Sequence, residues 1–191
     1  MSLWDFFSFA TKAISGKSIG KSWEIEGTGY SQVRDVLTLI DAICDAYDNP
    51  AFAPKPDGTT FCNMAVQAIC NVMGYKDFAG LTADQMVDKM ASDENWTPVP
   101  FDNAQNLANQ GLLVLAGLDG PSMNQAHGHI VVIRPGRTCI SGKWQQTPRC
   151  LNIGGENFLA RAKKGPLIGM ACGLNEAFIE MPKIYVWRAS L

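Results

Sequence analysis

Cys62 and the pair His127 and His129 are the residues of this sequence best suited to covalent chemistry. Cys62 follows a stretch rich in turn-forming residues and begins the run CNMAVQAICNVMGY, in which apolar residues recur at helical spacing up to Gly74. A cysteine in the first turn of a helix lies against unpaired backbone N–H groups and the positive end of the helix dipole, and both favour the thiolate. Because the sequence contains 2 histidines, a histidine base for this thiol must be one of them.

His129 is the better candidate for this base. In the run HGHIVVIRPG, alternation along an expected strand places His129 on the same face as Val131 and Ile133. His129 begins the strand, where the sheet can hold the ring rigidly within hydrogen-bond reach of a neighbouring helix. His127 lies two residues earlier, at the mouth of the strand. The side chains that we expect to contact substrate are Phe61, Asn63, Asn124 and His127.

A third side chain should orient the base by accepting a hydrogen bond from its second ring nitrogen. The leading candidate is Asn152, near the end of an expected strand at residues 149–153. Adjacent antiparallel strands bring Asn152 beside His129 if a hairpin joins them. Glu156 and Asn157, which follow a pair of glycines, remain open as alternatives.

Two other kinds of site are considered and rejected. The two histidines at i and i+2 resemble part of a zinc site, but the sequence has no CxxC or HExxH motif. The polar stretch at residues 15–22 resembles a phosphate-binding loop, yet Ser15 stands where that loop requires its first glycine, and no strand precedes it. We therefore expect neither a metal ion nor any other cofactor.

The composition is that of a globular protein, with 47% hydrophobic residues in 191. We expect a single domain over residues 1–191, with residues 1–30 as an N-terminal extension that begins with a short amphipathic helix. A net charge of -2 and a pI near 5.6 lack the basic surface of a nucleic-acid-binding protein. No apolar run reaches the roughly 18 residues of a membrane span, and the N-terminus lacks the pattern of a secretory signal.

The order of elements predicts an α+β fold in which helices cover one side of an antiparallel sheet of about four to six strands. Helical patterns occupy residues 31–47 and 62–73, a capping box at Thr82 opens a helix to about residue 91, and Asp102 is placed to cap a helix over residues 103–109. Strand patterns follow at residues 112–116, 129–134, 149–153 and 183–188.

The other cysteines are too scattered for a disulfide-built scaffold. Cys44 and Cys70 lie on apolar helical faces, where we expect them to be small buried side chains. Cys139 and Cys150 flank a hairpin-like segment. A disulfide between these two remains open for a protein that works in an oxidising compartment.

The motifs resemble those of papain-like peptidoglycan amidases and endopeptidases, which include the NlpC-type and CHAP-type enzymes and related toxins delivered by type VI secretion. The matching residues run from about 55 to 190 and are Thr60-Phe61-Cys62-Asn63, a helix ending at Gly74, Gly128-His129-Ile130-Val131-Val132, Pro135-Gly136 and Leu151-Asn152-Ile153-Gly154. The sequence departs from typical NlpC-type enzymes because it has no Asp-Cys-Ser-Gly motif. The resemblance implies a papain-like fold with Cys62 as nucleophile, His129 as base and Asn152 as the orienting residue.

The function implied is cleavage of an amide bond in peptidoglycan stem peptides through a thioester. For an enzyme without a secretory signal, we expect export by a dedicated secretion system or by lysis, and action in the periplasm or cell wall. A secreted effector would be restrained by an immunity protein that plugs the groove between Cys62 and His129, beside the loop at residues 119–126. Two alternatives remain: a cysteine peptidase or deamidase acting on a protein, and a non-catalytic binding module.

Overall fold

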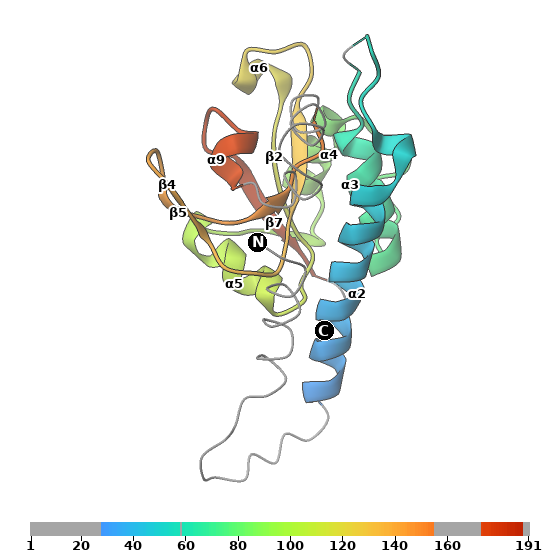
Figure 1. Ribbon diagram of the computed structural model, residues 1–191, viewed down its shortest axis with the longest axis vertical. Helices are drawn as coiled ribbons and strands as arrows, with labels where there is room; N and C mark the ends of the chain where they lie inside the picture. Colours follow the sequence, from blue (N-terminus) through green and yellow to red (C-terminus); the bar gives the residue numbers. More distant parts are fainter. Residues whose placement is uncertain (1–27, 58, 155–172, 189–191) are drawn as a thin grey trace.

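The computed structural model describes residues 28–57, 59–154 and 173–188 (Figure 1). The expected amphipathic segment at the N-terminus lies outside the described residues. The described part of the chain forms a mixed α+β fold in which helices pack on an antiparallel sheet, as the pattern of helices and strands predicts.

The main sheet has five strands in the order β1-β7-β2-β3-β6, and every neighbouring pair is antiparallel. These strands are β1 (Trp96–Pro98), β2 (Val114–Leu118), β3 (His129–Ile133), β6 (Cys150–Leu151) and β7 (Lys183–Trp187). A separate hairpin consists of β4 (Cys139–Ser141) and β5 (Gln145–Thr147). The sheet therefore contains the strand of His129 and, next to it, the strand that leads into Asn152.

Helices cover both faces of the sheet (Figure 1), so the expectation of helices on one side only is wrong. On one face lie α2 (Thr28–Asp48), α3 (Cys62–Met73) and α4 (Ala83–Ser92). On the other lie α5 (Ala104–Asn109) and α9 (Leu174–Ala177), beside the β4–β5 hairpin. The short elements are α6 (Gly120–Met123) and two 3-10 turns, η1 (Pro50–Phe52) and η2 (Phe101–Asn103).

The sheet separates two hydrophobic layers because successive side chains of a strand point to opposite faces. In β3, Ile130 and Val132 pack with the α2–α3–α4 layer, whereas Val131 and Ile133 pack with the α5–α9 layer. All four side chains are at most 1% exposed. A strand buried on both faces has little freedom to shift, so the position of its first residue, His129, is fixed by the core.

The ends of α3 and α4 follow from local sequence. Gly74 ends α3 with φ 100°, a left-handed conformation that glycine adopts at low cost, and its N–H donates to the carbonyl oxygens of Cys70 and Asn71. Thr82 opens α4 through the predicted capping box: its hydroxyl accepts from the Gln85 N–H, and the Gln85 side chain accepts from the Thr82 N–H. Phe61, which precedes α3, provides no side-chain cap.

The prediction that Asp102 caps a helix is wrong. The chain already turns as η2 from Phe101, so Asp102 lies inside a 3-10 turn and lacks the extended backbone of a cap residue. The α-helix that follows begins at Ala104, and Asn103 before it makes no side-chain cap bond. The sequence did not predict the short elements η1, β1, η2, α6 and α9. The four-residue helix α6 is capped by Asp119, whose carboxylate accepts from the Ser122 N–H at 2.8 Å.

Cys139 and Cys150 are thiols and do not form a disulfide. Cys139 is paired with Thr147 across the hairpin, and its thiol donates to the Thr147 carbonyl oxygen at 3.5 Å. Cys150 belongs to the main sheet, where it lies opposite Ile133. Cys70 is fully buried as predicted, whereas Cys44 is half-buried against the α2–α3–α4 layer.

No helix within the described ranges is both long enough and apolar enough to cross a bilayer.

Candidate active site

Cys62 is the first residue of α3, and its side chain is 6% exposed. The loop that leads into α3 and the helix α6 that precedes β3 lie toward the same end of the molecule (Figure 1). Helix α3 packs directly against β3. This arrangement brings the first residue of a helix and the first residue of a strand together, although 67 positions separate Cys62 from His129 in the chain.

His129 and Asn152 lie on the same face of the sheet. The pairing of Val132 with Leu151 and of Ile133 with Cys150 runs toward Asn152, which directly follows β6. Continued by one residue, this register puts Asn152 opposite Val131 and diagonal to His129. The Oδ1 of Asn152 lies 2.8 Å from the Nε2 of His129. Asn152 is 4% exposed and His129 is half-buried, so the hydrogen bond is partly buried.

The other ring nitrogen of His129 faces Cys62. A side-chain hydrogen bond joins the Cys62 sulfur to the His129 ring. Because Nε2 faces the Oδ1 of Asn152, we assign this bond to Nδ1. The three side chains thus form the chain Cys62–His129–Asn152, with the imidazole in the middle.

Backbone N–H groups also reach the Cys62 sulfur. One comes from Asn63, in the first turn of α3, and the other from Ile130. The Arg134 N–H donates to the Arg149 carbonyl oxygen, on the side of β3 where β6 lies. Every second N–H of a strand points to the same side, so the Ile130 N–H also points toward the β6 side. There β6 pairs only as far as Val132, so the Ile130 N–H is available to the sulfur of Cys62.

These contacts favour the thiolate of Cys62. Burial is the largest single influence and raises the pKa of the thiol, but the charge and hydrogen bond of His129 and the two backbone N–H groups together outweigh it. The pKa of Cys62 is therefore lowered from the usual 9.0 of a thiol.

His129 shifts in the opposite direction. Burial lowers its pKa, yet the negative charge of Cys62 and the hydrogen bonds to Cys62 and Asn152 outweigh burial, so the pKa lies above the usual 6.5. A lowered thiol pKa beside a raised imidazole pKa favours transfer of the Cys62 proton to His129, which would give a thiolate–imidazolium pair. Such a pair can attack a carbonyl carbon and protonate a leaving group.

Cys70, two helical turns further along α3, shows that burial alone has the reverse effect. Its side chain is 0% exposed, and desolvation raises the pKa of its thiol well above the usual range. Both cysteines lie on one helix and face the core. The difference between them is therefore the polar surroundings of Cys62.

Phe178 is a member of the site that the sequence did not reveal. This side chain, just after α9, is 2% exposed, and its ring centroid lies 5.4 Å from that of His129 at an interplanar angle of 53°. The contact restricts rotation of the imidazole from the side of the α5–α9 layer. A phenylalanine in a short terminal helix region carries no signal that distinguishes it from an ordinary core residue.

The four side chains expected to contact substrate differ in exposure. His127 and Asn124 are exposed in the segment before β3, and Asn124 has a left-handed backbone with φ 53°. Phe61 is partly buried, with the Lys55 ammonium 5.4 Å from its ring centroid. The Asn63 amide donates to the Leu81 carbonyl oxygen at 2.9 Å, which ties it to the segment before α4. Glu156 and Asn157 lie outside the described residues.

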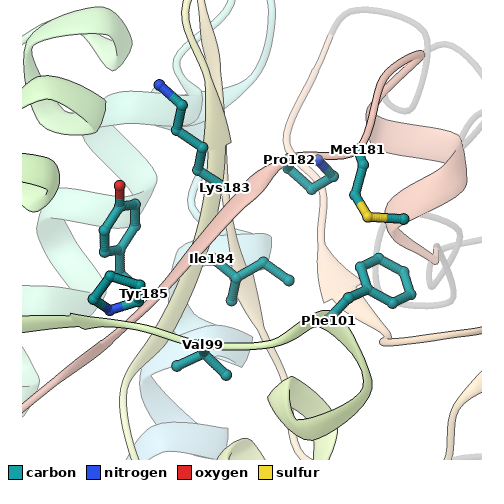
Figure 2. A pocket seen from close by; sticks show the side chains of 8 residues that line it. Val99, Phe101, Met181, Pro182, Lys183, Ile184 and Tyr185 are labelled. Atoms are coloured by element: carbon teal, nitrogen blue, oxygen red, sulfur yellow. The ribbon is translucent and has the colours of Figure 1, made fainter.

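An open pocket of about 290 Å³ lies elsewhere, between β1 and the start of β7. Figure 2 shows the side chains of Phe101 and Met181 at one end of it and those of Lys183 and Tyr185 at the other. Neither Cys62, His129 nor Asn152 lines this pocket.

Within the described residues, no group of three or more His, Cys, Asp and Glu side chains is arranged to hold a metal ion. No protein-family model matches the chain, and no curated protein matches it in sequence.

Proposed function

We propose that this protein is a cysteine hydrolase that cleaves amide bonds in the stem peptides of bacterial peptidoglycan. The observation that carries the reaction type is the hydrogen-bonded chain from Cys62 through His129 to Asn152. Nucleophile, base and orienting group have the order and mutual contacts that acyl transfer requires.

The reaction begins with the thiolate of Cys62 attacking the carbonyl carbon of the scissile amide. The backbone N–H of Cys62, at the start of α3, is the donor that we assign to the oxyanion. As the C–N bond breaks, imidazolium His129 gives its Nδ1 proton to the departing amine, which leaves a thioester on Cys62. Neutral His129 then takes a proton from water, and the resulting hydroxide displaces the Cys62 thiolate to release the carboxylic acid.

Asn152 holds the ring for both steps. Its Oδ1 accepts from Nε2–H, which leaves Nδ1 directed at the sulfur and at the leaving nitrogen. The same bond favours the charged ring, which is the form required when the amine departs.

The choice of substrate rests on the motif resemblance, in which Cys62, Gly128-His129 and Asn152 occur in the order found in papain-like peptidoglycan hydrolases. A papain-like fold is part of this proposal. A cysteine peptidase or deamidase acting on a protein would use the same three residues. A binding module with an inert thiol fits less well, because the pKa of Cys62 is lowered although the side chain is buried.

Peptidoglycan lies outside the cytoplasmic membrane, so the proposed enzyme acts there, as an effector toxin or a phage-type lysin. For an effector, the producing cell needs an immunity protein. Occlusion of the region between the start of α3 and the start of β3 would block Cys62 and His129 together, and residues 119–126 border that region.

Digestion of purified sacculi, followed by mass analysis of the released fragments, tests the proposal. The wild-type protein should release peptides with one new amine and one new carboxylate each. Cys62→Ala should release none, and Cys70→Ala is the matched control on the same helix. If the wild type releases nothing while Cys62 is reactive, the cell-wall substrate is wrong and the protein-substrate reading takes its place.

A further inference from the structure

The segment between β2 and β3 is held at both ends by one carboxylate. Oδ1 of Asp84 accepts from the Gly120 N–H at 2.7 Å, and Oδ2 accepts from the Gly128 N–H at 2.9 Å. Asp84 lies in the first turn of α4, and the contact to Gly128 spans 44 residues of sequence. Gly128 directly precedes His129. Asp84 therefore fixes the backbone at the point where the segment enters β3.

Both glycines lie where the surrounding chain leaves no room for a side chain. A Cβ on Gly128 would lie 2.5 Å from the Leu118 carbonyl oxygen and 3.1 Å from the Asp84 carboxylate. A Cβ on Gly120 would lie 2.7 Å from the Gln125 carbonyl oxygen. Real Cβ atoms essentially never come as close as the two shorter distances. Glycine at both positions therefore permits the fold of this segment in which the two N–H groups reach the Asp84 carboxylate.

The start of α4 is also tied to the Cys62 helix. The side-chain amides of Asn63 and Gln67 both donate to the Leu81 carbonyl oxygen, at 2.9 and 3.0 Å. Asn63 follows Cys62, and Leu81 directly precedes the cap residue Thr82 of α4. The same turn of chain consequently holds the helix of the nucleophile through Leu81 and the strand of the base through Asp84.

We propose that Asp84 is a positioning residue that sets the separation of Cys62 and His129 by anchoring Gly128 to the start of α4. This proposal rests on the proposed function only in its prediction of catalytic rates. The anchoring of Gly128, and its effect on the contact between Cys62 and His129, can be tested without knowing the substrate. Asp84 acts through Gly128 and does not contact the reacting atoms.

The carboxylate suits this role because it stays ionised throughout the neutral range. Burial is the largest influence and raises its pKa, but the N–H groups of Gly128 and Gly120, its own backbone N–H and the nearby charge of His127 outweigh burial. The pKa of Asp84 lies below the usual 3.8, so both hydrogen bonds persist wherever the Cys62–His129 pair is active and are lost only as the pH falls through that lowered pKa.

The test compares Asp84→Asn with Asp88→Asn. The asparagine keeps the shape of Asp84 but replaces one acceptor oxygen with an NH2 group, which opposes a backbone N–H. Asp88 is exposed one turn further along α4 and controls for the lost charge. We expect Asp84→Asn to lower kcat about 10-fold with little change in KM, the loss expected from one charge-assisted hydrogen bond. Asp88→Asn should match the wild type.

A second readout needs no cell-wall substrate. The rate of Cys62 alkylation by iodoacetamide, followed across pH, reports the thiolate directly. In Asp84→Asn the profile should move toward that of an ordinary thiol, because a displaced His129 stabilises the thiolate less. A wild-type profile in Asp84→Asn overturns the positioning role, whether or not sacculi are cleaved. A loss of activity that only follows the loss of folded protein, measured by circular dichroism, also overturns it.

A measurement on the wild type alone covers the case in which Asp84→Asn does not fold. The amide resonances of Gly120 and Gly128 should titrate together with a single midpoint below pH 3.8, and both amides should be protected from hydrogen exchange at neutral pH. Independent titrations, or rapid exchange at both glycines, would contradict the anchoring.

Discussion

The His129 Nε2 lies 2.8 Å from the Asn152 Oδ1, and this bond determines which ring nitrogen faces Cys62. An imidazole that can rotate presents either nitrogen, or neither, to a thiol. The buried amide oxygen of Asn152 removes that freedom on one side of the ring, and Phe178 restricts it from the face. The hydrogen bond from Asn152 thus fixes the orientation of the His129 ring toward Cys62.

Replacing Asn152 should weaken the reaction without abolishing it. Asn152→Ala removes the acceptor of a hydrogen bond to a charged ring, a contact worth about 1.5–3 kcal/mol. We therefore expect kcat/KM to fall roughly 10- to 100-fold. Asn152→Asp retains the acceptor oxygen and should keep most of the activity. Steady-state kinetics on a stem peptide make this comparison, and equal losses in the two variants would show that the oxygen is not what matters.

The pH dependence of kcat/KM should be bell-shaped, and the two shifted pKa values set its limits. Activity rises as the pH exceeds the pKa of Cys62, which lies below 9.0, because the thiolate forms there. Activity falls as the pH exceeds the pKa of His129, which lies above 6.5, because the imidazolium proton for the leaving amine is then lost. In Asn152→Ala the alkaline limb should move to lower pH, since the hydrogen bond to Asn152 raises the pKa of His129. If the alkaline limb stays at the same pH, Asn152 does not raise the pKa of His129 and this prediction is wrong.

Much of the frame around the site was predictable from local sequence. Helical spacing after Cys62 and the glycine at residue 74 predicted α3 with its correct start and end. Strand-type sequence patterns predicted β2, β3 and β7, with β2 expected two residues too early, and the capping box predicted α4. Local sequence is enough to predict these helices and strands because the residues that form each pattern are close together in the chain.

The relations that build the site were less accessible. The partnership of His129 with Asn152 depended on the register of β6, a strand of two residues. The sequence favoured Asn152 but left Glu156 and Asn157 open as alternatives. The contact of Asp84 with Gly128 joins a helix to a loop 44 residues away. The helix dipole favours an aspartate in the first turn of any helix, so Asp84 has an ordinary explanation that does not involve Gly128. No local pattern distinguishes an anchoring carboxylate from an ordinary one.

Cys70 should matter for stability and leave the chemistry intact. Cys70→Ala removes a fully buried sulfur from the core between α2 and α3, and we expect a loss of about 1 kcal/mol. This corresponds to a decrease in Tm of about 2–4 °C for a protein of this size. Thermal unfolding measures the loss, and specific activity per folded molecule should equal that of the wild type. A catalytic defect with normal stability would assign Cys70 an unexpected role.

Gly74→Ala should destabilise the protein through backbone strain alone. A Cβ at Gly74 would meet only the Trp187 ring at 3.6 Å, an ordinary contact, but φ is 100° there. We expect a loss of about 1–2 kcal/mol in the free energy of unfolding, measured with denaturant. Gly142→Ala is the matched control because nothing lies within 4 Å of its added Cβ and its φ is not in the strained range. Similar stability in the two variants would contradict the strain at the end of α3.

The most direct test of the account is the pH dependence of Cys62 alkylation, located by peptide mass analysis. In the wild type, iodoacetamide should modify Cys62 rapidly at a pH below 9.0, the usual thiol pKa, whereas Cys70 stays unmodified while the protein is folded. In His129→Ala the reaction at low pH should disappear, because the imidazolium is the largest influence that favours the thiolate. A Cys62 that reacts in the wild type only as an ordinary thiol does, or equally in His129→Ala, would contradict an activated nucleophile at this position.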